Sequence, residues 1–269
     1  FPDMQELPSS AKSPMEMFGA MAKSYFAQKK GIDPEDLVVV SVMPCTAKKF
    51  EAKRDEMNSN GTSRNDIDIS ITTRELAQLI KQMNIDLLEL EEEDFDDPLG
   101  ESTGAGVIFG KTGGVMEAAL RTGYEWITGQ ELGDVEFEDV RSTEYGMKVA
   151  HVQIGDVTLN VAVASGLGNA RAIMEEIKAG NPNQLHFIEI MACPGGCVNG
   201  GGQPYHFGDL SIIQDRQAAL LEEDENKTIR KSHENPSIKK IYEEFLGKPG
   251  SHVAHEYLHT PAHVYREKI

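Results

Sequence analysis

The sequence predicts an α/β fold in which mainly parallel, twisted sheets are flanked by helices. Two short apolar runs, residues 37–43 and 186–191, are interpreted as buried strands. The first is Val-rich and lacks polar alternation, which is typical of a strand inside a parallel sheet. We expect the first run to be buried on both of its faces. Segments with helical periodicity alternate with such runs, and 269 residues of which 39% are hydrophobic can bury a sizeable core.

Capping signals and periodicity predict the individual elements. Ser13-Pro14 is an N-cap followed by a proline at the first helical position, so a helix is expected over residues 13–30. Gly155-Asp156 separates two strand-like runs and predicts a hairpin. The remaining expected elements are strands at 67–72, 148–154 and 157–164 and helices at 73–83, 115–122 and 166–178. The glycine-rich stretch 100–114 suggests two lobes, residues 1–102 and 103–269.

Composition excludes several classes of protein. A formal net charge of -18 argues against a nucleic-acid partner, because binding a polyanion requires clustered Lys and Arg. The acidic run 89–97 is expected to be a solvated loop. No stretch approaches the roughly 18 consecutive apolar residues of a membrane span. Three cysteines are too few for a disulfide framework, so a reducing, cytoplasmic setting is expected.

The three cysteines follow the two apolar runs. Cys45 ends the first run, and Cys193 and Cys197 follow the second with glycines around them. Ligands of open α/β sheets bind beyond the carboxyl ends of strands, and glycines let the backbone wrap closely around a bulky metal cluster. Zinc is an alternative, with His186 or His206 as the fourth ligand. A 4Fe-4S cluster normally takes four thiolates, so one ligand would be absent or replaced.

Two longer motifs carry a family resemblance. Met43-Pro44-Cys45-Thr46-Ala47-Lys48-Lys49-Phe50-Glu51 resembles the second signature of iron-only (FeFe) hydrogenases, and residues 189–203, Glu-Ile-Met-Ala-Cys-Pro-Gly-Gly-Cys and the following glycine run, resemble the third. The similarity covers most of the chain to about Gln203, including residues 7–17 and 102–120. It implies the iron-only hydrogenase fold, with the metal cluster between two lobes, and reversible interconversion of dihydrogen with protons and electrons.

The resemblance also implies roles for single residues. Cys45, Cys193 and Cys197 would bind a 4Fe-4S cluster, and Cys197 would also bridge to a diiron subcluster with CO, CN and dithiolate ligands, where dihydrogen would be cleaved heterolytically. Lys48 would donate to one cyanide. The other implied positions are Met43 and Met191 beside the subcluster, Ser13 and Pro14 along the second cyanide, Phe109 in the apolar wall and Ser9 in the proton path.

The first signature, Thr-Ser-Cys-x-Pro-x-Trp, is absent from the chain. In the family it supplies the fourth cluster ligand, so we expect an upstream segment or a second chain that carries it. A redox partner such as a ferredoxin or an accessory iron-sulfur subunit is also expected. Three alternatives stay open: a non-enzymatic iron-sulfur assembly or scaffold relative, a slow hydrogen-sensing member, and an inactive fragment or cofactor-free state.

Overall fold

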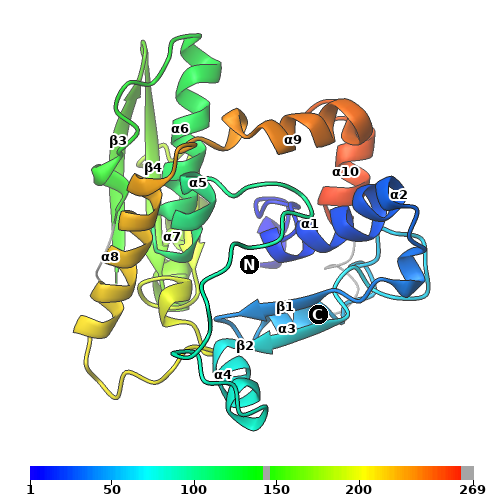
Figure 1. Ribbon diagram of the computed structural model, residues 1–269. Coiled ribbons are helices and arrows are strands. Elements are labelled where there is room, and N and C mark those ends of the chain that lie inside the picture. Colours follow the sequence, from blue (N-terminus) through cyan, green and yellow to red (C-terminus); the bar gives the residue numbers. More distant parts are fainter. Residues whose placement is uncertain (142–145, 262–269) are drawn as a thin grey trace. The chain divides into compact units, whose positions relative to one another are not determined.

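The computed structural model describes residues 1–141 and 146–261, which form two compact units (Figure 1). The first unit comprises Phe1–Glu101 and the described residues from Pro236 onward, and the second comprises Ser102–Asn235. The sequence-based lobes, 1–102 and 103–269, differ from this grouping after Pro236. The physical reason is a hydrophobic cluster in which Ala20 and Met21 pack with Ile241, Leu246 and Ala254.

The first unit holds a two-stranded parallel sheet and a long helical N-terminal segment. The predicted helix over 13–30 is confirmed as a continuous α–π–α run, and Ser13 Oγ accepts the N–H of Glu16 at 3.4 Å. Strands β1 and β2 pair with Val40 opposite Ile69. The elements are η1 (Pro2–Met4), α1 (Pro14–Met21), the π-helix η2 (Ala22–Phe26), α2 (Ala27–Lys30), η3 (Pro34–Asp36), β1 (Val40–Met43), α3 (Lys48–Glu51), β2 (Ile69–Thr72), α4 (Thr73–Gln82), α9 (Pro236–Ile241), the π-helix η8 (Tyr242–Leu246) and α10 (His252–Leu258).

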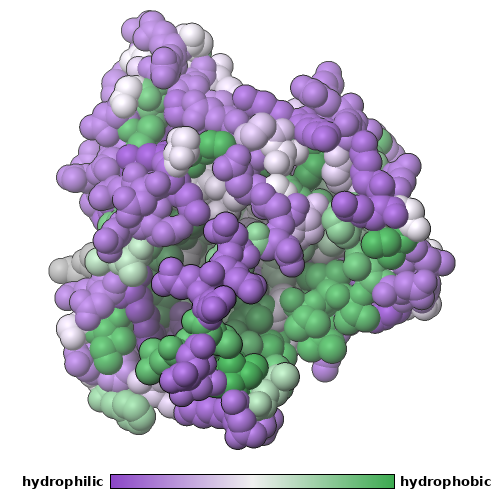
Figure 2. Space-filling view, in the orientation of Figure 1, coloured by the Kyte–Doolittle hydropathy of each residue, from purple (hydrophilic) through white to green (hydrophobic). Residues whose placement is uncertain are grey.

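One prediction for the first unit is wrong: the run 37–43 is not buried on both faces. Only Val40–Met43 is a strand, and Val40 and Val42 are 50% and 44% exposed. Val39 and Met43 pack inward, whereas the outward side chains have no covering layer among the described residues. Figure 2 shows hydrophobic surface in the lower part of the view, where β1, β2 and α4 lie. The exposed apolar side chains of these elements are Val40, Val42, Ile69 and Leu79.

The second unit holds a three-stranded sheet of order β3-β4-β5. The predicted hairpin is confirmed, because β3 and β4 pair antiparallel around Gly155-Asp156, and β4 and β5 pair in parallel. Helix α6 packs Met116 and Leu120 on one face, and α7 packs Ile173 on the other. The elements are α5 (Gly104–Val107), η4 (Ile108–Gly110), α6 (Gly114–Thr128), η5 (Glu138–Val140), β3 (Met147–Ile154), β4 (Val157–Ser165), α7 (Leu167–Lys178), β5 (Phe187–Met191), η6 (Cys197–Asn199), α8 (Ser211–Asn226) and η7 (Ser232–Glu234).

The acidic run and the membrane prediction have simple outcomes. Residues 91–97 are exposed and form neither helix nor strand, as expected for a solvated loop. None of the described helices combines the length and apolar character of a membrane span.

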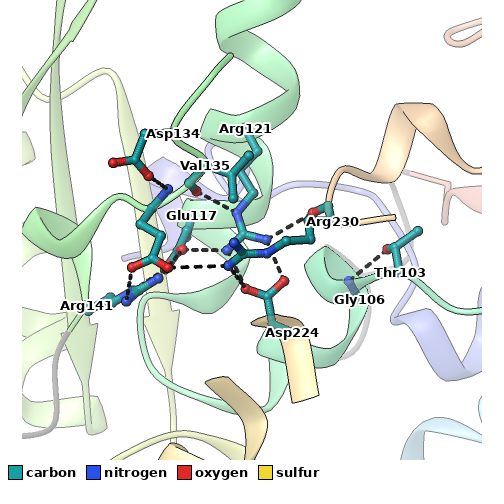
Figure 3. Close-up of polar contacts among 10 residues, drawn as sticks. Thr103, Gly106, Glu117, Arg121, Asp134, Val135, Arg141, Asp224 and Arg230 are labelled. Carbon is teal, nitrogen blue, oxygen red and sulfur yellow. Dashed lines mark hydrogen bonds and ion pairs between the residues drawn. The ribbon is translucent and has the colours of Figure 1, made fainter. Parts of the chain in front are cut away.

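A buried ion network joins α6 to α8 in the second unit (Figure 3). Arg121 is fully buried and donates to both carboxylate oxygens of Asp224 at 2.8 Å and to Glu117 Oε1 at 2.7 Å. Arg230 and Arg141 complete the pairing of Asp224 and Glu117, respectively. Burial by itself would raise the pKa of the Asp224 carboxyl, but hydrogen bonds from both arginines hold that pKa below its ordinary value.

Replacing Arg121 by Met should lower the free energy of unfolding by about 3 kcal/mol, because two buried carboxylates lose their shared partner. Urea-induced unfolding of the chain would measure the change. Arg171→Met, on the exposed surface of α7, is the control and should change the value by less than about 0.5 kcal/mol. Equal stability of the two variants would contradict a structural role for the network.

Candidate metal-cluster site

Cys45 lies just beyond the carboxyl end of β1, as the sequence predicts. The strand ends at Met43, and the chain turns at Pro44 before α3 begins at Lys48. Cys45 is half-buried and carries a free thiol. A short strand held in parallel register with β2 therefore fixes where this thiol leaves the sheet.

The start of α1 packs against the same strand. Met15 shares a buried cluster with Met43, and Ser41 Oγ donates to Met15 Sδ at 3.1 Å. This contact brings the segment that holds Ser13 and Pro14 against β1, where Ser13 is half-buried and Pro14 is exposed. Two segments that are 30 residues apart in the sequence thus meet in one unit.

Within the described part of the chain, Lys48 and Ser9 form hydrogen bonds and ion pairs with residues close to them in the sequence. The Lys48 ammonium forms an ion pair with Glu51, the last residue of the same motif, one helical turn later. Ser9 is exposed, and its Oγ accepts the N–H of Ala11 at 3.2 Å. Glu51 had no predicted role, although its spacing of three residues from Lys48 is the signal for such a pair.

The loop from Cys193 to Cys197 follows β5 and is shaped by two glycines. Gly195 and Gly196 have φ values of +82° and +97°, which residues with a side chain rarely adopt. A Cβ on Gly196 would lie 2.7 Å from the backbone of Lys111 and Thr112. The loop can therefore lie directly on the segment after Phe109 only because no side chain intervenes.

Hydrogen bonds brace the backbone of this loop. The N–H of Thr112 and the side-chain amide of Gln217 donate to the carbonyl of Gly195 at 3.1 and 2.9 Å. Asn199 Nδ2 donates to the carbonyl of Pro194 at 3.1 Å, and Arg216 Nη1 donates to that of Val198 at 3.0 Å. Helix α8 therefore supports the cysteine loop, a contribution that no motif predicts.

The other predicted residues of the second unit flank the loop. Met191 is the last residue of β5, half-buried, and its carbonyl accepts the N–H of Gly166 at 2.8 Å. Phe109 is half-buried and packs with Ala105, Ile108 and Ala118. The two histidines do not support the zinc alternative. His186 Nδ1 and His206 Nδ1 each accept a hydrogen bond from a nearby backbone N–H group.

Glu189 is a supporting residue that sequence reasoning did not identify, although it opens the third motif. Its carboxylate accepts the N–H groups of Gly113 and Met116 at 2.6 and 2.7 Å, at the N-terminus of α6. Burial raises the pKa of this carboxyl despite these hydrogen bonds. The side chain ties the strand before Cys193 to the helix that bears Arg121.

The donor set fits an iron-sulfur cluster. None of the three cysteines forms a disulfide, all three are half-buried, and two of them lie in a glycine-shaped loop that suits a bulky cluster. Lys111, beside this loop, is 2% exposed, and its ammonium has no hydrogen-bond partner in the part of the chain that the structure describes. Burial lowers its pKa to about 8. A thiolate-bound cluster is the kind of anionic group that such a cation favours. Cys45 belongs to the first unit and Cys193 and Cys197 to the second, so a shared cluster stays a prediction about how the units associate.

A separate group of possible metal ligands already has a cation. Glu125, His233 and Glu234 lie close enough together to bind an ion. The ammonium of Lys231 is 2.6 Å from Glu125 and 2.8 Å from Glu234. This cluster is therefore explained as an ion-pair network of the second unit.

Comparisons with known proteins define the class. Residues 1–201 match the family model of the iron-only hydrogenase large subunit, C-terminal domain, and residues 210–261 match that of the iron hydrogenase small subunit. The chain belongs to the iron-only hydrogenase family. Its fold is that of hydrogenase structures such as HydA1 from Chlamydomonas reinhardtii in its apo C377H variant, at a TM-score of 0.81 and 44% identity over 97% of this chain and 71% of that one.

The curated relatives include hydrogenases and also the cytosolic Fe-S cluster assembly factor narfl of Xenopus tropicalis, at 30% identity over 97% of this chain and 54% of that protein. The chain is 58% identical to the NADP-reducing hydrogenase subunit HndD of Solidesulfovibrio fructosivorans, over 97% of this chain and 44% of that protein. It is 46% identical to iron hydrogenase 1 of Clostridium pasteurianum, over 96% and 45%. It is also 33% identical to protein NAR1 of Arabidopsis thaliana, over 95% and 56%. The chain thus spans less than half the length of the two hydrogenases.

Replacing Gly196 by Ala should reduce iron bound after anaerobic reconstitution by more than half, because the added methyl group would collide with the backbone of residues 111 and 112. Iron and sulfide analysis of the purified protein measures this effect. Gly168→Ala is the matched control, since α7 leaves open space at that position. Unchanged iron content in the Gly196 variant would rule out the tight loop as a requirement.

Proposed function

We propose that this chain is the catalytic portion of an iron-only hydrogenase, which interconverts dihydrogen with protons and electrons. The observation that carries the proposal is the joint presence of both cysteine motifs, each beyond a parallel strand, in a chain 58% identical to a hydrogenase subunit. Met43, Lys48 and Met191, expected beside the diiron group, are all retained in these motifs.

The residues of the chain would have distinct tasks. Cys45, Cys193 and Cys197 would hold a 4Fe-4S cluster, and a diiron subcluster with CO, CN and dithiolate ligands would supply the hydrogen chemistry. Lys48, oriented by Glu51, would donate a hydrogen bond to an anionic ligand of that group. The second side of the diiron group would be lined by Ser13 and Pro14. Water would be excluded by Phe109, Met43 and Met191, and protons would pass through Ser9.

The proposal includes partners. A segment upstream of this chain, or a second chain, would supply the fourth cluster ligand, and the exposed apolar faces of β1 and β2 are the kind of surface that a further polypeptide layer covers. A ferredoxin or an accessory iron-sulfur subunit would deliver electrons. We expect the working protein in the cytoplasm, without nucleic acid.

An iron-sulfur assembly protein is the second candidate function. It is favoured by the 33% identity to NAR1 and by 30% identity to a cytosolic Fe-S cluster assembly factor of Xenopus tropicalis. Such a protein would need the cysteines but not the Lys48–Glu51 pair. The lower identities, compared with 58% and 46% for the hydrogenases, make this the weaker alternative.

The protein that carries this chain, reconstituted anaerobically with both clusters, should reduce a viologen dye with dihydrogen. Infrared bands of iron-bound CO and CN report the diiron group independently of activity. Lys48→Ala should lower the dye-reduction rate on the order of 10²-fold, because it removes a charge-assisted donor, and should leave the 4Fe-4S content unchanged.

Lys53→Ala, an exposed lysine five residues later, is the control and should retain the full rate. A 4Fe-4S cluster without CO or CN bands and without activity would favour the assembly protein. Full diiron loading with a very low rate would instead indicate a hydrogen-sensing member.

A further inference from the structure

Glu16 in α1 is a buried carboxyl group that the proposed chemistry has not used. Its side chain is fully buried, and neither carboxyl oxygen has a hydrogen-bond partner among the described residues. An ionised carboxylate without partners is costly to bury, so this group is expected to hold a proton. It lies one helical turn after Ser13, the residue expected beside the diiron group.

Helix α1 turns the face with Glu16 toward the segment before β2. Gly19, three residues later on the same face, is so close to this segment that an added Cβ would lie 2.8 Å from the carbonyl oxygen of Asp66. One turn further, Lys23 Nζ donates to the carbonyl of Asn65 at 2.6 Å and pairs with Asp68 at 2.9 Å. The face of α1 that bears Glu16 therefore lies toward the backbone before β2.

Charged groups on three other segments act on Glu16. The carboxylates of Glu51 and Asp66 raise its pKa, after burial as the larger cause, while the ammonium groups of Lys12 and Lys48 lower it, with a net rise to about 7. Lys48 pairs with Glu51, and Lys12 pairs with Asp66 at 3.4 Å. With two cations and two carboxylates around it, the cluster is neutral when Glu16 is protonated and carries one negative charge when it is not.

The cluster reaches solvent on one side. The Lys12 ammonium donates to Ser59 Oγ, and Ser59 lines a cavity of about 720 Å³ whose wall includes His255 and His259. His259 Nδ1 is 3.0 Å from Ser10 Oγ, and the rings of the two histidines lie 4.3 Å apart between centroids. His255 is exposed, so this wall of the cavity is open to water.

On the other side, the cluster ends at the Lys48–Glu51 pair of the cysteine motif. We propose that Glu16 is a proton-transfer residue that connects the histidine-lined cavity with the Lys48–Glu51 pair. In the inward direction the O–H bond of Glu16 breaks and an O–H bond forms on the Glu51 carboxylate, relayed by water because no described residue hydrogen-bonds to Glu16. Glu16 then regains its proton as an N–H bond of the Lys12 ammonium breaks, and Lys12 is reprotonated through the Ser59 hydroxyl from the cavity. Oxidation of dihydrogen runs the same steps in reverse. No electron moves in these steps. The inference rests on the proposed function, because only a hydrogenase needs this proton.

The buried proton itself can be detected without catalysis. In the reconstituted protein, infrared difference spectra across pH 5–9 should show a protonated carboxyl band that disappears near pH 7 and is missing in Glu16→Gln. The raised pKa also means that the contribution of Glu16 to stability is fully present below about pH 4.5 and is lost as the pH rises through about 7. The thermal midpoint of the wild type should therefore fall over that range more than that of Glu16→Gln. Glu91→Gln, in the exposed acidic loop, is the control and should match the wild type.

Catalysis tests the transfer. Glu16→Gln should lower hydrogen evolution on the order of 10²-fold and raise the solvent isotope effect, with iron content and CO and CN bands unchanged, and Glu16→Asp should recover part of the rate. The inference is overturned if the wild type is active and the Glu16→Gln variant is equally active. It is also overturned if the wild type lacks the titrating band. A loaded wild type without hydrogenase activity instead overturns the proposed function. If Glu16→Gln fails to fold, the titration of the wild-type band and the rate of Glu16→Asp together test the inference.

Discussion

The second unit depends on the bidentate pairing of Arg121 with Asp224. A fully buried guanidinium is tolerable only where carboxylates and carbonyls satisfy its donors, and this one has Glu117, Asp224 and the carbonyl of Val135. The pair fixes α8 on α6. Because α8 carries Gln217, and because the N-terminus of α6 is held by Glu189, the same interaction sets the position of the Cys193–Cys197 loop. A charge network whose members lie on both sides of the two cysteines in the sequence thus controls where the two thiols lie.

The first unit is organised by charge in a different way. Three ion pairs lie near α1, and in each pair the lysine charge is balanced by one carboxylate. These pairs are Lys12–Asp66, Lys23–Asp68 and Lys48–Glu51. Glu16 is a fully buried carboxyl with no hydrogen-bond partner among the described residues. The same helix packs Met15 against Met43, so the acid and the methionine expected at the metal group belong to one rigid assembly.

Much of the fold could be predicted, since capping and periodicity are local properties. The hairpin at Gly155-Asp156 and the helix after Ser13-Pro14 occur as expected. The burial of β1 could not be predicted, because an apolar run indicates a strand without saying how many layers cover it. The docking of the C-terminal helices on α1 also escaped prediction, since it depends on contacts between residues more than 200 positions apart, such as Met21 and Ile241.

The sequence by itself determined the chemistry of the site: three cysteines at two strand ends, the glycines between two of them, and the lysine that follows Cys45. Those features are readable because thiolate ligation and tight loops demand particular residue types at fixed spacing. The tertiary structure alone decided which groups support them. Gln217, Arg121 and Glu16 belong to no motif, and Glu189 is a motif residue for which the sequence predicts no role. Their roles arise because burial removes water and leaves each polar group dependent on distant partners.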